Sequence, residues 1–174
     1  MAYVREIITE GHPTLRKVAK RVTASELADP LFQQLIDDMF ETMYAAPGIG
    51  LAAPQVNVGK RLFTVDLRDD EPGHGPLVIV NPKFTVVEGE IEATEGCLSV
   101  PGMVGEMTRY ERVVCIALDR DGKKMTLEGD GLFARCLQHE MDHLDGILYI
   151  DKAKNLRPAV TQEELEAAEA ALTS

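Results

Sequence analysis

The spacing of apolar and polar residues divides the chain into a helical first part, a middle of short apolar runs, and two helical segments near the end. From Ser25 onward, apolar residues recur every three or four positions, which predicts an amphipathic helix beginning at Ser25. That helix is expected to end where Pro47, Gly48 and Gly50 interrupt the pattern. Residues 13–22 predict a shorter helix that starts with a proline.

The middle of the chain is rich in Val, Ile, Thr and Phe, residue types that favour strands. Strands are predicted over residues 61–67, 76–82, 83–91, 111–119 and 123–129. The polar segment 69–76 is expected to be a loop, and Asp121-Gly122 predicts a hairpin between the last two strands. Five or six strands that follow one another with little helix between them favour antiparallel pairing.

Two further helices are predicted in the last third of the chain. One begins at Asp130 and stops at Gly146, and the other spans residues 161–172 with Thr161 as its N-cap. The last helix contains four glutamates and no basic residue. The predicted class is α+β, with antiparallel strands around a central metal-binding helix, an N-terminal helix and a C-terminal helix. Residues 1–174 are expected to form a single domain.

The charge balance excludes several classes of function. The chain has 174 residues and a net charge of −11, which repels a phosphate backbone, so no direct nucleic-acid binding is expected.

No run reaches the roughly 20 apolar residues that cross a bilayer, and the charged N-terminal stretch lacks a signal-peptide core. We therefore expect a cytoplasmic protein without a membrane partner, whose three cysteines are reduced.

Residues 139–143 form an H-E-x-x-H sequence on the helix predicted from Asp130. His139 and His143 project from one helix face one turn apart and can bind a single metal ion. The carboxylate of Glu140 can accept a proton from metal-bound water, whose pKa a catalytic Zn²⁺ lowers to about 7. The alternative is a solvent-exposed helix face with two incidental histidines.

A catalytic metal needs a third protein ligand. Tyr149 stands where the long zinc-protease signature has its third histidine, so the third ligand is not a histidine at that position. His12 and His74 lie in unrelated loops and are expected at the surface. A downstream glutamate such as Glu163 would suit another protease class, although the four glutamates of the last helix are more typical of a solvent-exposed face.

Cysteine is the remaining ligand type. Cys115 lies in a predicted strand and is most simply a buried small hydrophobic residue. Cys136 precedes His139 by three residues and either approaches the site or packs in the apolar stripe of the helix. Cys97 lies in a segment bounded by Gly and Pro that is suited to presenting a thiolate, so it ranks first.

Residues 48–55 form a glycine-rich segment that lacks the Lys-Ser/Thr ending of a phosphate loop. Small residues let a backbone approach a substrate closely, and Gln55 could donate its amide N–H to an oxyanion. The alternative is a helix stop followed by a plain turn.

Three segments together resemble the signature motifs of the peptide deformylase family, in the family's order: GIGLAAPQ at 48–55, EGCLS at 95–99 and QHEMDHLDG at 138–146. The opening GHPTLRKVA is also similar to that family. The resemblance implies a metal-dependent hydrolase that removes the N-formyl group from the formyl-methionine of newly synthesised polypeptides and releases formate. Nascent formyl-Met polypeptides are the implied partners.

The same resemblance implies that Cys97, His139 and His143 bind one divalent metal ion, with water as the fourth ligand. Fe²⁺ is the implied physiological ion, and Zn²⁺, Ni²⁺ or Co²⁺ could replace it. A cysteine and two histidines would by themselves suit zinc at least as well. Glu140 is the implied proton acceptor, which later returns the proton to the departing amine.

The resemblance also assigns the remaining site residues. Gln55 and the backbone N–H of Leu98 are implied donors to the tetrahedral oxyanion. The backbone of Gly48, Ile49 and Gly50 is implied to align the substrate.

Residues outside these motifs raise three open questions. Glu95 or Gln138 could orient the metal ligands, and Arg109 either pairs with a carboxylate such as Glu95 or lies at the surface. Some deformylases carry an arginine shortly after the cysteine motif; residues 102–105 lack it, so substrate preference beyond the first residue is open. The acidic last helix disfavours docking on ribosomal RNA, although ribosome proximity by another route is compatible with the sequence.

Two other interpretations of the sequence compete with the deformylase hypothesis. A zinc metallopeptidase would normally need a third His or Glu ligand. A non-catalytic metal-binding domain would need neither Glu140 nor Gln55 beside its ligands.

Overall fold

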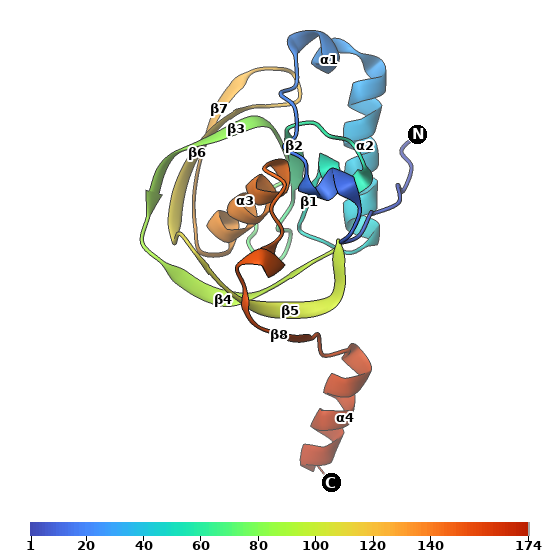
Figure 1. Ribbon diagram of the computed structural model, residues 1–174, viewed down its shortest axis with the longest axis vertical. Coiled ribbons are helices and arrows are strands. Elements are labelled where there is room, and N and C mark those ends of the chain that lie inside the picture. The colour runs from blue at the N-terminus through green and yellow to red at the C-terminus, as the bar shows by residue number, and fades with distance from the viewer. Residues whose placement is uncertain (174) are drawn as a thin grey trace.

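The computed structural model describes residues 1–173, apart from the side chain of Gln162. Two antiparallel sheets and the N-terminal helices enclose helix α3 (Gly131–Leu144), which lies near the centre of the molecule (Figure 1). The first sheet has the strand order β1-β2-β3-β6-β7, with β1 Gly50–Ala52, β2 Leu62–Val65, β3 Leu77–Glu88, β6 Arg112–Leu118 and β7 Lys124–Asp130. The second has the order β4-β5-β8, with β4 Ile91–Cys97, β5 Val100–Arg109 and β8 Lys154–Pro158. The prediction of an α+β fold with a central helix is confirmed.

The N-terminal helices differ from the prediction. The expected helix over residues 13–22 is only a 3-10 turn at Pro13–Arg16. The expected single helix from Ser25 is two helices, α1 (Ala24–Ala28) and α2 (Pro30–Ala45). The break follows from Pro30, which has no backbone N–H to continue α1 and which suits the first turn of a new helix. Asp29 caps α2 by accepting the N–H of Leu31 at 2.9 Å.

The strands also differ in number and extent. Residues 1–173 contain eight strands rather than five or six. The predicted strands 76–82 and 83–91 are one long strand, β3, because its pairing with β6 continues through two irregularities around Pro82 and Thr85. Bulges of this kind let a strand bend and accommodate a proline. The segment around Cys97 that Gly and Pro bound belongs to the β4–β5 hairpin. The hairpin predicted at Asp121-Gly122 is confirmed between β6 and β7.

Helix α3 is buried on most of its surface. Phe133, Leu137 and Leu144 are at most 1% exposed and belong to the same core cluster as Phe63 and Ile79 of the first sheet. Polar residues of α3 are buried as well, among them Gln138, Glu140 and His143. A helix that buries charge at this depth needs a compensating partner or a functional reason.

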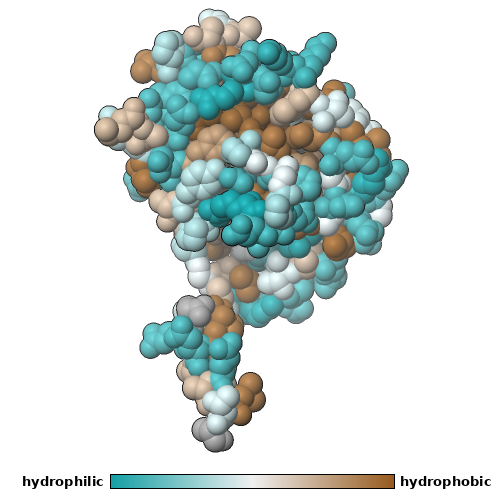
Figure 2. Space-filling view, turned by 180° about the vertical axis from the view of Figure 1, so that it is seen from behind, coloured by the Kyte–Doolittle hydropathy of each residue, from teal (hydrophilic) through white to brown (hydrophobic). Residues whose placement is uncertain are grey.

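A glycine ends helix α3 and a threonine caps the last helix. Gly146 follows α3 with φ +75°, and a Cβ there would lie 2.7 Å from the carbonyl oxygen of Arg16, so glycine is required. Thr161 caps α4 (Gln162–Thr173), as predicted, because its hydroxyl accepts the N–H of Glu164 at 3.1 Å. Helix α4 projects away from the rest of the molecule (Figures 1 and 2). In the described part of the chain, no helix has the length and apolar character needed to cross a membrane.

Candidate metal centre and active site

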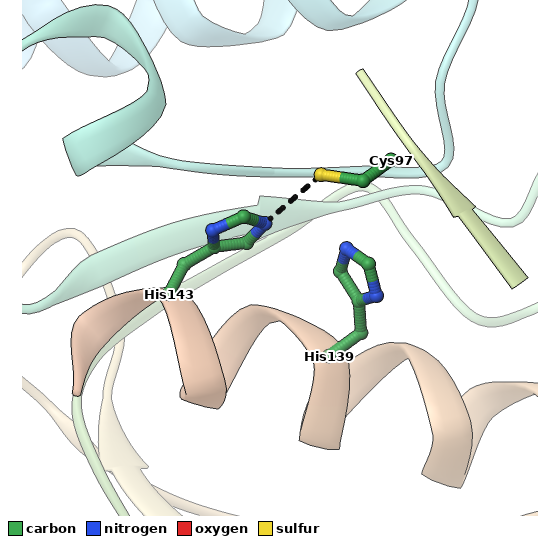
Figure 3. Close-up of side chains that lie close together, drawn as sticks. All are labelled: Cys97, His139 and His143. Carbon is green, nitrogen blue, oxygen red and sulfur yellow. Dashed lines mark hydrogen bonds between the residues drawn. The ribbon is translucent and has the colours of Figure 1, made fainter. Parts of the chain in front are cut away.

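Helix α3 and the end of β4 bring three metal-binding side chains together (Figure 3). The ligand atoms of Cys97, His139 and His143 all lie within 4.8 Å of one another. The Sγ of Cys97 is 3.3 Å from Nε2 of His143. The histidines are one helical turn apart, so both rings face the cysteine. This group is consistent with a single divalent metal ion.

A buried ion network holds His139 in place. Nδ1 of His139 lies 3.0 Å from Oε1 of Glu95, which leaves Nε2 available as the ligand atom. Arg109 donates two hydrogen bonds of 2.8 Å to the carboxylate of Glu95 and one of 2.7 Å to Asp142. Arg109 is 6% exposed, so the surface alternative considered for it was wrong. Of the two candidate orienting residues, Glu95 contacts a histidine of the metal-binding group.

Gln138 has a different set of contacts. Its side chain accepts the N–H of Tyr110 and donates to the carbonyl oxygens of Tyr110 and Ala134, each at 2.9 Å. It therefore ties the end of β5 to helix α3.

The electrostatics of the group favour a bound cation. Burial alone would raise the pKa of Glu95, but Arg109 and His139 lower it to about 2, so Glu95 is a carboxylate. Burial would lower the pKa of His139, whereas its hydrogen bonds with Cys97 and Glu95 raise it to about 10. Burial lowers the pKa of His143 well below its usual value, so this imidazole is neutral, as a metal ligand must be. The anionic surroundings of His139 can be balanced by a proton or by a metal cation.

Glu140 lies beside the group, 4% exposed on α3. Its Oε2 has no hydrogen-bond partner among the residues that the structure describes. Burial raises the pKa of Glu140 to about 7. The carboxylate packs so closely against β1 that a Cβ on Gly50 would lie 2.7 Å from Oε1. A buried carboxylate without a partner is costly, which makes Glu140 a candidate functional residue.

A cavity of about 760 Å³ opens onto these residues. One wall is the segment 46–50, and the opposite walls are the end of β4 and the part of α3 from Leu132 to Glu140. The predicted site residues that line it are Gly48, Ile49, Gly50, Gln55, Cys97, Leu98, His139 and Glu140. His143 is 1% exposed and lies outside the cavity lining.

The amide of Gln55 is fixed by three contacts. Its Oε1 accepts the N–H of Ala52 at 3.0 Å, and its Nε2 donates to Oγ of Ser99 at 3.1 Å. Nε2 also lies 3.7 Å from the Sγ of Cys97. A donor group is therefore held next to the metal-binding group.

The other cysteines are accounted for. Cys115 is buried, as predicted, and burial raises the pKa of its thiol to about 11. Cys136 is 6% exposed and also lines the cavity, so both alternatives considered for it hold. Burial raises the pKa of the Cys136 thiol well above its usual value, which keeps it protonated.

The other histidines have local structural roles. Nδ1 of His12 accepts the N–H of Thr14 at 3.2 Å and caps the first 3-10 turn. His74 stacks on Phe133 and pairs with Glu71. Both are partly buried rather than fully at the surface.

Sequence reasoning missed one charged residue of the cavity, Arg135. The signal was present, since Leu132, Arg135 and His139 share one helix face by their spacing.

Two imidazoles one helical turn apart, a cysteine and a buried carboxylate beside an open cavity define a metal-dependent hydrolase. The family model for polypeptide deformylase matches residues 4–159. A curated peptide deformylase from Symbiobacterium thermophilum is 54% identical over 97% of this chain and 76% of its own length. The chain therefore belongs to the polypeptide deformylase family, whose activity, the hydrolytic removal of the N-formyl group from nascent polypeptides, it shares.

Solved structures agree in fold. The peptide deformylase from Legionella pneumophila is 43% identical with a TM-score of 0.80, and the match covers 95% of this chain and 92% of that one. A class I type b peptide deformylase from Acinetobacter baumannii, with Met-Ala-Ser bound, is 35% identical with a TM-score of 0.80, over 87% of this chain and 99% of that one. The resemblance noted in the sequence is confirmed over nearly the whole chain.

Proposed function

We propose that Cys97, His139 and His143 hold one divalent metal ion and that Glu140 moves the proton during hydrolysis of formyl-methionyl peptides. The observation that carries this proposal is the juxtaposition of three ligand atoms within 4.8 Å of one another with a buried carboxylate in one cavity. Fe²⁺ is the proposed physiological ion, and Zn²⁺, Ni²⁺ or Co²⁺ can replace it. When bound, such an ion lowers the pKa of a water molecule and polarises a carbonyl group.

Glu140 is the residue placed to accept the proton of the attacking water. The absence of a hydrogen-bond partner for Oε2 within residues 1–173 leaves that oxygen free to receive it. A carboxyl group whose burial raises its pKa to about 7 can both take and return a proton near neutral pH. Glu140 then gives the proton to the departing amine, and the products are formate and a free N-terminal methionine.

Gln55 and the backbone N–H of Leu98 are the proposed donors to the oxygen that becomes negative in the transition state. The contacts of Gln55 with Ala52 and Ser99 hold its amide rigidly, so the donor does not have to be ordered during the reaction. A single donor of this kind typically contributes about 3 kcal/mol to transition-state stabilisation.

The substrate is proposed to lie between the segment 46–50 and the end of β4. The backbone of Gly48, Ile49 and Gly50 would align the peptide, and the apolar side chains of Leu98 and Leu132 would contact the methionine. The Met-Ala-Ser bound to the Acinetobacter enzyme supports a peptide in this cavity. We place the enzyme in the cytoplasm, where it meets nascent chains without using the acidic helix α4 to bind ribosomal RNA.

The test is a direct assay on protein purified without oxygen. Because the three ligand atoms form one mononuclear group, we expect elemental analysis to find about one metal ion per chain. Iron is the ion that we expect the protein to retain. Formyl-Met-Ala-Ser should yield formate and free Met-Ala-Ser in equal amounts. Cleavage of the Met-Ala bond instead would support the metallopeptidase alternative, and retained metal without formate release would support a non-catalytic domain.

A Gly50→Ala variant tests the close packing of Glu140 against β1. The added Cβ would lie 2.7 Å from Oε1 of Glu140 and 3.1 Å from Sγ of Cys136, and both neighbours are buried. Displacing the carboxylate by about 1 Å should lower kcat for formate release by about 100-fold. Gly59→Ala is the matched control, because a Cβ there meets nothing within 4 Å. Equal activity of the two variants would contradict the proposed position of Glu140.

A further inference from the structure

Arg135 places a positive charge at the cavity that the proposed mechanism does not use. Its side chain is 17% exposed and comes from α3, one turn before His139. Among the described residues that line the cavity, it is the only arginine, and no lysine is present.

The hydrogen-bonding capacity of this guanidinium is mostly unused. Nη2 donates to the carbonyl oxygen of Thr94 at 3.1 Å. Nε is buried without a hydrogen-bond partner in the described part of the chain, and it lies 4.0 Å from Oε2 of Glu95. A guanidinium has five N–H donors, so most of them remain available.

The charge of Arg135 is not required to neutralise its neighbour. Glu95 already accepts two hydrogen bonds from Arg109, and its Oε1 also lies 3.0 Å from Nδ1 of His139. A partly buried cation that is not needed for an internal ion pair points to an external anion.

The contact with Thr94 places the charged end at the rim of the cavity. Thr94 is exposed and belongs to β4, which is an edge strand of the three-stranded sheet. The formyl group would react near Cys97 and Glu140, deeper in the site. With the formyl group at that depth, the residues that follow the methionine would leave the cavity toward solvent past this rim.

We propose that Arg135 is a specificity-determining residue that binds a carboxylate on one of the two residues following formyl-methionine. This inference rests on the proposed function and names a preferred substrate class. Arginine suits a carboxylate because its planar fork can donate two parallel hydrogen bonds. The net charge of −11 would by itself disfavour acidic peptides, so a local cation is needed to accept them.

The experiment measures kcat/KM for formate release by the metal-loaded enzyme on five peptides. These are formyl-Met-Ala-Ser and its versions with Asp or Lys at the second or third residue. For Arg135→Leu we expect the ratio of kcat/KM between acidic and basic peptides to fall about tenfold, mainly through KM, at whichever position meets the guanidinium. Arg135→Lys keeps the charge without the fork and should keep part of the preference.

The matched control is Arg157→Leu, which removes an exposed arginine that pairs with Glu106 outside the cavity. It should leave the ratio unchanged. An equal loss on all five peptides in Arg135→Leu would mean that Arg135 only ties α3 to β4, and an unchanged ratio would mean that it does not meet the substrate. Either result overturns the inference while formate release from formyl-Met-Ala-Ser upholds the proposed function. Absence of formate release from every peptide by the parent enzyme overturns both.

Discussion

Replacing Glu140 with glutamine should lower kcat for deformylation about a thousandfold, within the range typical of removing a general base. The amide has nearly the same shape as the carboxyl group but cannot accept the proton of the attacking water. Because Glu140 is not among the three grouped ligand atoms, metal content should be unchanged. The variant should fold normally, since the substitution removes a buried group that has no hydrogen-bond partner for Oε2 among the described residues.

Formate release, metal content and thermal unfolding of Glu140→Gln are compared with those of Glu128→Gln. Glu128 lies on β7, its side chain is 65% exposed, and it pairs only with Arg112 in the described structure. The control should keep full activity. A Glu140→Gln enzyme that binds metal and retains more than about a tenth of the parent kcat would exclude Glu140 as the general base, because that role contributes at least about 100-fold.

The structure brings together the three residues that the sequence offers as metal ligands, Cys97, His139 and His143. The spacing of His139 and His143 fixes their common helix face, and the motif around Cys97 supplies the third ligand type. Burial of Glu140 and the exact contacts of Gln55 depend on neighbouring strands, so the sequence could name these residues but not their environment.

Two other features were not settled by the sequence, for different reasons. The break between α1 and α2 was written locally in Asp29-Pro30, but the continuous apolar spacing concealed it. The partners of Arg109 lie 14 and 33 residues away along the chain, and only the β4–β5 register and the position of α3 bring them together. No periodicity within one element contains that information.

The second large effect is expected from replacing Arg109 in the buried ion network. Arg109→Met should lower the free energy of unfolding by about 3–5 kcal/mol, because it leaves the buried carboxylate of Glu95 without its main partner. For a chain of this size, that corresponds to a fall in Tm of roughly 10 °C. The orientation of His139 also depends on Glu95, so the affinity for the metal should fall about 10- to 100-fold.

Two variants separate this effect from the loss of a surface charge. Arg112→Met removes a partly exposed surface arginine whose partners are Glu88 and Glu128, and such pairs contribute about 1 kcal/mol or less. Arg109→Met combined with Glu95→Gln replaces the isolated carboxylate with a neutral amide and should recover part of the lost stability but not the metal affinity. Thermal unfolding with and without metal, together with titration of the metal, measures both quantities. If Arg109→Met behaves like Arg112→Met, the buried network neither stabilises the fold nor orients His139.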